Sequence, residues 1–451
     1  MRTAIVLFTR DLRVHDQPAL AAAAAAGDRV VPLFVFDRAV LARFGAPNRV
    51  AFLLDALGDL DASLRTRGGA LVLREGDVVE QVMRVAVESK AEAIFLGEDV
   101  SAYAQARERA LRAACTEARL ELHVLPGVTV IPPGDLAPAR GDCYRVFTPY
   151  WRRWRSAPRR AVVAAPRQIA LPGRLALGKM PALAGLVRGP VSPELPRGGE
   201  SEGRRRLTRW LTLGLAAYDR LHDDLAADGT SRLGAYLHLG CISPLELVER
   251  ASGRDGAEPF VRQLCWRDFY AQLLAAQPEI SHADFRPRGR RWRDDAGVLA
   301  AWKDGRTGYP IIDAGMRQLA REGFMHNRAR LLTGSFLTRD LHLDWRLGAA
   351  HFAGLLVDGD VASNSGNWQW VAGTGVDTRP NRVFNPISQA SRFDPAGDYV
   401  RRYVPELAGI DGAAVHEPWK LARPPQGYPE PIVDHAEAVA RHRRLAAYSG
   451  A

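Results

Sequence analysis

Short apolar runs alternate with longer amphipathic, alanine-rich stretches through the first 125 residues. The apolar runs have the length and composition of buried strands and lie at residues 3–8, 30–36, 71–73, 93–96 and 120–125. Between them apolar positions recur at helical spacing, as at 49–66 and 78–89. Continuous apolar strands separated by helices predict a parallel sheet with helices on both faces. We therefore expect an α/β, Rossmann-like domain at residues 1–125.

The pattern changes after residue 125. Proline and glycine are frequent from 126 to 203, which is typical of a connector between domains, with one amphipathic helix predicted at 144–155. From 204 onward the strand pattern disappears, and helical periodicity is found at 203–215, 243–251, 258–276, 296–303, 314–321, 329–340 and 345–356. We expect an all-helical domain at 204–451.

Net charge and cysteine content limit the possible partners, compartment and metal sites of the protein. The net charge is +10, and only four of the 61 lysine and arginine residues are lysine. An arginine-rich surface attracts polyanions and makes their binding depend on salt. The four cysteines form no CxxC pair, which indicates a reducing cytoplasm and argues against a zinc or iron–sulfur site. No apolar run reaches the roughly 18–20 residues of a membrane span, and Asp11 and Asp16 argue against a signal peptide. We expect a cytoplasmic protein without a metal.

Several enzyme classes lack their signatures. Residues 9–16, which follow the first predicted strand, contain no GxGxxG, which argues against a nicotinamide dehydrogenase. The chain has no nucleophile elbow, no HExxH and no phosphate-binding P-loop, which removes most hydrolases and NTPases. A ligand at the carboxyl ends of the predicted strands is still expected for such a sheet.

The densest candidate chemistry lies at residues 358–370, which contain two carboxylates, three amides and two tryptophans. If this stretch is helical, Asp360, Asn364 and Trp368 share one face. A row of carboxylate, amide and indole suits a planar ligand rich in heteroatoms. The alternative is a capped helix end whose polar side chains bind backbone groups, with both tryptophans in the core.

Two further clusters point to a polar or anionic ligand. Residues 230–233 precede an apolar helix, where hydroxyls, backbone N–H groups and the helix dipole can hold a phosphate, although plain N-capping is the commoner use of such residues. Asn327 and Arg330 share a helix face and could converge on one ligand. An inward-facing arginine needs a carboxylate partner, for which Asp358 or Asp360 is the candidate.

Several short blocks resemble the signature blocks of the photolyase/cryptochrome family. They lie at residues 8–13, 266–270, 307–314, 325–328, 358–360 and 385–386 and run in family order along nearly the whole chain. Within the family the chain is most similar to class I cyclobutane pyrimidine dimer DNA photolyases. The resemblance implies an α/β domain followed by a helical FAD-binding domain.

The resemblance also implies a reduced flavin, FADH⁻, in the helical domain. The residues that match its phosphate end are Tyr218, Thr230, Ser231, Arg232 and Leu233. Those that match its adenine–ribityl side and isoalloxazine are Arg267, Asn327, Arg330, Asp358, Asp360 and Asn364. Asn364 falls where the family faces flavin N5, and a neutral amide there can hydrogen-bond N5 without supplying a titratable proton. An Arg330–Asp358 pair would place a cation near the reduced ring.

The implied activity is light-driven repair of UV-damaged DNA. Excited FADH⁻ donates an electron to a pyrimidine dimer that has been extruded from the duplex, the cyclobutane ring splits and the electron returns. The residues that match the dimer pocket are Gln263, Trp266, Asn327, Arg328, Leu331 and Trp370. Trp292, Trp345 and Trp368 match the family's electron-transfer chain from flavin to surface, although each alone could be plain packing.

Three positions depart from the family pattern. Gln263 stands where dimer photolyases of this class usually carry a glutamate that hydrogen-bonds the damaged bases. Leu331 replaces a methionine of similar volume, and Gly234 replaces a serine near the phosphates. Dimer repair remains the expectation, with a cryptochrome-type photoreceptor that does not repair as the alternative. A (6-4) photolyase is less expected, because that branch carries a histidine pair where this chain has His326-Asn327.

The resemblance implies an antenna chromophore in the N-terminal domain. The matching residues lie at predicted strand ends or on the helices that follow and are Arg10, Phe34, Asp37, Arg49, Glu98 and Asp99. They resemble the pocket of members that bind 8-hydroxy-5-deazaflavin. A folate antenna, or solvated loops with no chromophore, are the alternatives. The expected partner is UV-damaged DNA, and the expected protein is a monomer.

Overall fold

The chain forms two compact units in a computed structural model that describes residues 1–376 and 382–448. The first unit consists of Met1–Val191, Pro196–Ala216 and Ser231–Pro278. The second consists of Ser192–Leu195, Ala217–Thr230 and Glu279–Ala451. The first unit thus includes, besides the predicted α/β domain and connector, several helices that sequence periodicity groups with the helical part.

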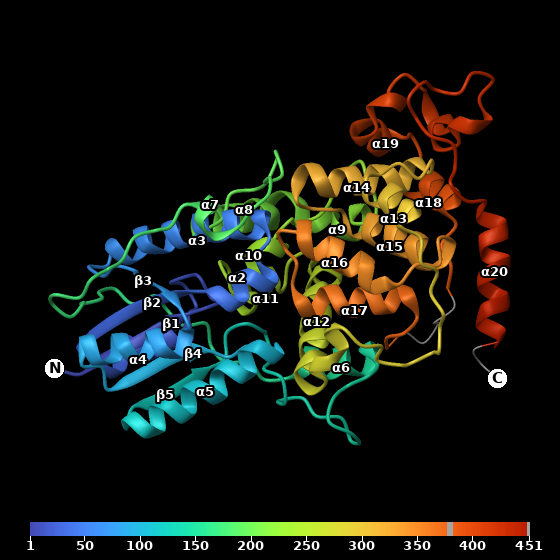
Figure 1. Ribbon diagram of the computed structural model, residues 1–451. Coiled ribbons are helices and arrows are strands. Elements are labelled where there is room, and N and C mark those ends of the chain that lie inside the picture. Colours follow the sequence, from blue (N-terminus) through green and yellow to red (C-terminus); the bar gives the residue numbers. More distant parts are fainter. Residues whose placement is uncertain (377–381, 449–451) are drawn as a thin grey trace. The chain divides into compact units, whose positions relative to one another are not determined.

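The first unit is built on a five-stranded parallel sheet (Figure 1). Its strands are β1 (Thr3–Phe8), β2 (Arg29–Asp37), β3 (Val72–Gly76), β4 (Ala93–Gly97) and β5 (Glu121–Leu125). Their order in the sheet is β3-β2-β1-β4-β5. The direction of progression therefore reverses between β1 and β4, which is where open parallel sheets bind ligands. The predicted α/β fold class is confirmed.

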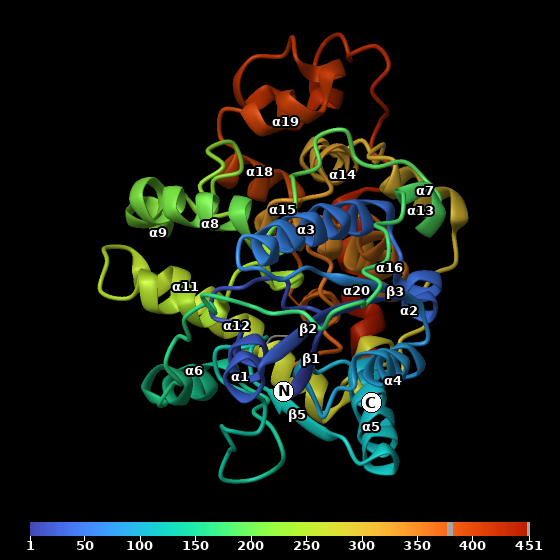
Figure 2. The same ribbon diagram turned by 90° about the vertical axis from the view of Figure 1, so that its left-hand side faces the viewer.

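Both faces of this sheet are buried. Ile5, Leu7 and Val31 point to one face and form a core with α4 (Val78–Ser89) and α5 (Ala102–Ala118). Figure 2 shows α4 and α5 side by side. The alternate residues of each strand point the opposite way, as the period of a strand requires, and α1 (Pro18–Ala26) packs on β1 and β4.

The remaining helices of the first unit include one long one. They are α2 (Arg38–Phe44), α3 (Pro47–Arg65), α6 (Phe147–Ser156), α7 (Leu183–Leu186), α8 (Glu200–Arg209), α10 (Gly234–His238), α11 (Pro244–Ala251) and α12 (Ala257–Ala276). A π-helical turn, Trp210–Gly214, continues α8. The helix predicted after residues 230–233 is a single turn, and its first residue is Gly234.

The second unit is helical. Its α-helices are α9 (Tyr218–Leu221), α13 (Ala296–Lys303), α14 (Pro310–Glu322), α15 (Asn327–Ser335), α16 (Trp345–Leu355), α17 (Val361–Ala372), α18 (Pro386–Phe393), α19 (Asp398–Tyr403) and α20 (His435–Tyr448). Its core gathers Trp302, Trp345 and Trp368 with aliphatic and phenylalanine side chains from most of these helices. The predicted helical domain is confirmed as to class.

The segment at 358–370 is positioned by close packing of α16 and α17. Asp360 caps α17 by accepting a hydrogen bond from the Ser363 N–H (2.9 Å), as the capping alternative for this stretch predicts. A Cβ at Gly348 on α16 would lie 2.2 Å from the Trp368 ring, so only glycine allows this approach. The four cysteines are buried and form no disulfide. Among the described residues no helix is both long and apolar enough to cross a membrane.

Candidate functional site

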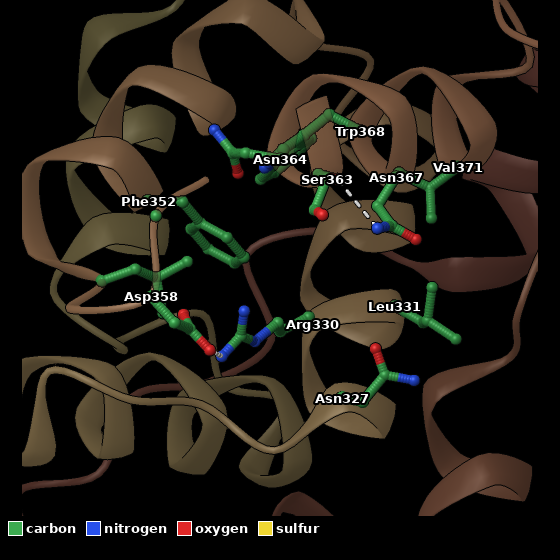
Figure 3. Close-up of a pocket in the computed structure, with 12 residues that line it drawn as sticks. Asn327, Arg330, Leu331, Phe352, Asp358, Ser363, Asn364, Asn367, Trp368 and Val371 are labelled. Carbon is green, nitrogen blue, oxygen red and sulfur yellow. Dashed lines mark hydrogen bonds and ion pairs between the residues drawn. The ribbon is translucent and has the colours of Figure 1, made fainter. Parts of the chain in front are cut away.

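A pocket of about 510 Å³ opens between three helices of the second unit (Figure 3). Helix α15 contributes Asn327, Arg330 and Leu331, and α16 contributes Phe352. The loop after α16 and helix α17 complete the wall with Leu356, Asp358, Gly359, Ser363, Asn364, Asn367, Trp368 and Val371. That volume includes space open to solvent, so the lining residues rather than the size characterise the site. Polar groups lie among apolar ones, as such a site requires.

The predicted arginine–carboxylate pair is present in this wall. Arg330 donates from one terminal nitrogen to Asp358 Oδ2 (2.9 Å) and from Nε to the Met325 carbonyl (2.7 Å). Asp358 Oδ1 is buried and has no hydrogen-bond partner among the residues that the structure describes. A buried carboxylate oxygen in that state fits a donor on a ligand, such as a ribityl hydroxyl or a ring N–H.

Amides of α17 face the same pocket. The Asn364 side-chain nitrogen donates to the Ala349 carbonyl (3.1 Å), which leaves its oxygen for a ligand. Asn367 lies one turn further on and donates to the Ser363 carbonyl (2.8 Å). Since both amides are tied to backbone carbonyls, their orientation is set before any ligand binds.

Other residues predicted to bind the cofactor lie outside this wall. Asp360 is engaged in capping α17 rather than lining the pocket. Tyr218 is buried beside His222, and burial raises the pKa of its phenol. Thr230 Oγ1 is buried without a hydrogen-bond partner among the described residues, and a phosphate oxygen could accept from it. Ser231, Arg232, Leu233 and Arg267 belong to the first unit.

Arg328 is paired, although the sequence predicts that it contacts substrate. Its Nε donates to Asp223 Oδ1 (3.1 Å), its other nitrogen binds Asp223 Oδ2, and its guanidinium lies 4.2 Å from the centre of the Phe393 ring. The pair attaches the Ala217–Thr230 segment to α15. Leu331 lines the pocket, whereas Trp370 is half-buried with Arg382 5.0 Å from its ring centre.

The three tryptophans of the predicted electron-transfer chain lie in the second unit at different depths. Trp368 and Trp345 are buried, at 3% and 0% exposure, and Trp292 is partly buried. Trp345 donates from Nε1 to Asp284 (2.8 Å). The Trp292 ring lies 5.4 Å from the His342 ring and 5.7 Å from the Arg290 guanidinium. Trp368 is the one that reaches the pocket wall.

In the first unit, helix α12 carries three of the predicted residues. Gln263 is exposed and Trp266 is half-buried on the next turn of the helix. The Trp266 ring is parallel to Phe147 of α6, with centroids 3.6 Å apart and an interplanar angle of 3°. Arg267 donates to the Val128 carbonyl (2.5 Å) and the Leu237 carbonyl (3.3 Å), so it holds the connector to the helix.

Asp268 anchors the same helix. Its Oδ2 accepts hydrogen bonds from the backbone of Val130 (2.9 Å) and Ile131 (3.1 Å) and from Trp154 Nε1 (2.9 Å). Its Oδ1 is buried without a hydrogen-bond partner among the described residues, 3.9 Å from Arg267. Burial raises the pKa of this carboxyl to about 6, against the lowering effect of its neighbours.

A second charged cluster lies at the carboxyl ends of β1, β2 and β4. Arg10 follows β1 and binds Asp99 (3.1 Å) and the His238 carbonyl (3.0 Å). Asp37 ends β2 and caps α2, and the Tyr103 hydroxyl donates to it. Glu98 follows β4; burial, reinforced by nearby carboxylates, raises its pKa to about 7.

The other two predicted antenna residues are less engaged with this cluster. Phe34 is buried in β2, and Arg49 of α3 donates to the Phe44 carbonyl (2.6 Å). Arg107 of α5 belongs to the cluster electrostatically, since Asp99, Asp11 and Asp37 oppose the lowering of its pKa by burial. Its Nε is buried without a hydrogen-bond partner in the described part of the chain.

Sequence reasoning did not single out several of these residues. Tyr103 and Arg107 lie on a helix whose pattern is that of an ordinary surface helix, so no local signal marks them. Phe352 and Leu356 of the pocket resemble core residues, because their spacing is that of any buried helix face. Only Ser363 and Asn367 carried a signal, since they stand one turn apart within the polar stretch at 358–370.

Comparison with known proteins defines the class. A family model described as DNA photolyase matches residues 4–168, and one described as the FAD binding domain of DNA photolyase matches residues 260–449. The chain belongs to the DNA photolyase family. The predicted resemblance is therefore confirmed, and the helical part is a FAD-binding domain of this family.

A curated relative matches nearly the full length. The chain is 54% identical to a deoxyribodipyrimidine photo-lyase from Streptomyces griseus over 98% of this chain and 99% of the relative. A solved class III photolyase from Agrobacterium tumefaciens covers 100% of this chain and 98% of that chain at 33% identity and a TM-score of 0.93. A photolyase from Sulfolobus tokodaii with two FAD molecules aligns at 32% identity and a TM-score of 0.88, covering 100% of both chains. A Synechocystis cryptochrome aligns at 30% identity and a TM-score of 0.90, covering 99% of both.

Proposed function

We propose that this chain is a deoxyribodipyrimidine photo-lyase that uses light to repair cyclobutane pyrimidine dimers in DNA. The pocket between α15, α16 and α17 carries the proposal, because it combines a paired arginine, oriented amides and a buried tryptophan in a FAD-binding domain. The 54% identity to a photo-lyase of that name over nearly the whole chain supports the reaction.

The pocket residues fit a reduced flavin. Bound FAD, reduced to FADH⁻ and excited by light, would supply the electron that splits the cyclobutane ring. Arg330 supplies positive charge that favours an anionic ligand. Asp358 holds that guanidinium, while its Oδ1, which has no partner among the described residues, accepts from the ligand. The Asn364 oxygen accepts without titrating, so the pocket delivers no proton at that point.

The remaining predicted residues complete this proposal. Trp292, Trp345 and Trp368 would carry an electron between a partly buried position and the pocket wall, which fits one partly buried ring and two buried ones. Gln263, Trp266, Asn327, Arg328, Leu331 and Trp370 keep the substrate roles predicted from the sequence. Because the Arg328 guanidinium is already bound to Asp223, it would have to bind DNA and Asp223 at the same time.

Repair of a thymine dimer in a single-stranded oligonucleotide tests the proposal. The purified, photoreduced protein should restore thymine absorbance in blue light and leave the dark sample and an undamaged oligonucleotide unchanged. If flavin is bound and photoreducible but no dimer is split, the cryptochrome alternative gains, which the similarity to the Synechocystis cryptochrome also supports. The next substrate would then be the (6-4) lesion. Assignment to class I rather than another class remains a prediction.

We also infer that the cluster at the carboxyl ends of β1, β2 and β4 holds an antenna chromophore. Glu98 Oε1 and Arg107 Nε, which have no hydrogen-bond partner in the part of the chain that the structure describes, support a polar ligand there. The reversal of strand order between β1 and β4 supports the location. We propose 8-hydroxy-5-deazaflavin, with folate, a second flavin or an empty site as alternatives. Extraction and mass analysis of the bound chromophore would identify it.

A further inference from the structure

The Phe147 ring stacks on Trp266, the tryptophan that the sequence predicts to stack on the lesion. Its ring lies parallel to that of Trp266 at 3.6 Å between centroids and 3° between planes. Phe147 is 6% exposed, while Trp266 is half-buried. One face of the indole is therefore covered, so a stacking base must use the other face. The Tyr270 ring also contacts the indole, with centroids 5.6 Å apart and an interplanar angle of 32°.

The edge of this aromatic pair is also closed. Phe269 meets Trp266 at 90° with centroids 5.4 Å apart and meets Phe147 at 89° with centroids 5.7 Å apart. The Arg262 guanidinium lies 5.4 Å from the centre of the Phe147 ring. A ring bounded on one face and one edge has few rotamers open to it, so the Trp266 plane is set before substrate arrives.

Phe147 itself is held in place from both sides along the chain. Just before α6, the Tyr144 backbone exchanges two hydrogen bonds with the Gln272 side chain (2.9 and 2.8 Å). Near the end of α6, Trp154 donates to the buried Asp268 (2.9 Å). Both anchors are on α12, the helix that carries Trp266, and α6 packs along it (Figures 1 and 2). Phe147 lies between the anchors, so it cannot move away without breaking one.

We propose that Phe147 is a positioning residue for recognition of damaged DNA, acting through Trp266, and this rests on the repair function proposed above. A stack of Phe147, Trp266 and an extruded base would gain from an indole that is already ordered, because no rotamer freedom is lost on binding. The connector between the predicted domains would thereby set affinity for the lesion without touching it.

Equilibrium binding in the dark tests this inference. The native holoprotein, Phe147→Leu and Phe147→Tyr are titrated with an oligonucleotide that carries one thymine dimer and with the undamaged sequence. Leucine has a similar volume but no ring, so we expect it to weaken dimer binding about two- to tenfold, the range of an aromatic pair. Binding of undamaged DNA should not change, and tyrosine should restore dimer affinity. Repair at saturating DNA should be near native for both variants, with only the half-saturating DNA concentration raised for leucine.

A matched control separates positioning from general loss of structure. Trp151→Leu removes another buried aromatic ring from the same helix. The Trp151 ring stacks on Trp154 rather than on Trp266. It should lower the thermal unfolding midpoint while leaving the ratio of damaged to undamaged binding unchanged. Bound-flavin absorbance should be native in all variants.

The outcomes are distinguishable. If the native protein prefers the dimer and Phe147→Leu prefers it equally, Phe147 is plain core and the inference fails. The inference also fails if Phe147→Leu weakens damaged and undamaged DNA alike. A native protein with bound flavin that does not discriminate the dimer would overturn the proposed repair function, and this inference with it.

Discussion

At the scale of single side chains, each proposed ligand site contains a buried carboxylate oxygen that lacks a hydrogen-bond partner among the described residues. These atoms are Asp358 Oδ1 in the second unit and Glu98 Oε1 in the first. Such an atom costs about 1–3 kcal/mol unless a ligand or water serves it. Asp358 has Arg330 beside it, whereas Glu98 has other carboxylates nearby. The two sites therefore differ in the charge they accept.

Replacing Asp358 by Asn should weaken flavin binding. The amide keeps the shape but removes the anion that holds Arg330, so the guanidinium that favours an anionic ligand is no longer fixed. We expect the Kd of FAD to rise about tenfold, which corresponds to about 1.4 kcal/mol. Fluorescence of released flavin measures it.

Glu406→Gln is the matched control for this variant. It breaks a similarly exposed pair with Arg317 (2.6 Å) elsewhere in the second unit. Equal loss of flavin affinity in both variants would show that Asp358 acts only through overall stability.

Glu98 should make antenna binding depend on pH. Since burial raises its pKa to about 7, the carboxyl is neutral and can donate a hydrogen bond below that pH, and it becomes an anion above it. We expect the fraction of antenna retained on gel filtration to fall between about pH 6 and pH 8. Glu98→Gln keeps a neutral donor and should retain the antenna at both pH values. A native protein whose retention is equal at both would contradict this assignment.

Gln263 tests how much a charge at the lesion contributes. It is exposed on α12 one turn before Trp266, so glutamate can be introduced there without disturbing the core. A charge-assisted hydrogen bond is roughly twice as strong as a neutral one, and we expect Gln263→Glu to raise repair per absorbed photon severalfold. Unchanged repair would mean that the amide already serves the substrate fully.

At the scale of elements, α6 and α12 act as one piece. Their polar anchors, Tyr144–Gln272 and Trp154–Asp268, are separated by the aromatic contact between Phe147 and Trp266. Hydrogen bonds to buried polar side chains fix one arrangement of two helices better than apolar packing alone. The packing of these two helices therefore determines the position of Trp266, which its local sequence does not reveal.

Asp268 at this junction should give stability a specific pH dependence. Its folded pKa of about 6 exceeds the value of 3.8 for a free aspartate, so the folded protein holds a proton that the unfolded chain has released. Stability from this group is complete below about pH 4 and is lost as pH rises to about 6, by an amount on the order of 3 kcal/mol.

Urea unfolding midpoints between pH 4.5 and pH 7 measure that loss. Asp268→Asn has no titrating group at this position. The difference between its urea midpoint and that of the native protein should therefore shift in favour of the variant as pH rises from 4.5 to 7. Parallel curves for the two proteins would show that Asp268 stays ionised in the folded state.

At the scale of the whole molecule, the excess of arginine suits a polyanionic substrate. The net charge is +10, and α6 exposes Arg152 and Arg153 on the side away from its buried aromatic residues. Binding to phosphates releases counterions, so affinity for DNA should fall steeply as salt is raised.

Replacing Arg152 and Arg153 together by Ala should make the slope of log affinity against log salt shallower by roughly 0.9 for each phosphate that the variant no longer neutralises. The preference for damaged over undamaged DNA should not change, since binding to the phosphate backbone carries no lesion information. The double variant Arg109→Ala and Arg112→Ala makes the same charge change on exposed positions of α5. This variant should keep the native salt slope. If its slope became equally shallow, the change in net charge alone would explain the effect of the Arg152 and Arg153 substitutions.

The sequence by itself determined the elements and one long-range contact. The five predicted strands all form, because short apolar runs separated by helices can be buried together in a parallel sheet covered on both faces. An inward arginine predicted a carboxylate partner, with Asp358 or Asp360 as the candidate, and the partner is Asp358. Those inferences rest on periodicity and charge balance, which are local properties.

Only the tertiary structure decided which side chains meet. Phe147 and Trp266 are 119 positions apart and both have the sequence context of ordinary core aromatics, yet their rings are parallel. Asp268 follows an arginine within the resemblance block, but nothing nearby predicts its three donors from residues 130, 131 and 154. The spacing of apolar residues indicates which face of a helix or strand is buried. Which side chain it contacts depends on how elements distant in the sequence pack together, and local spacing does not contain that information.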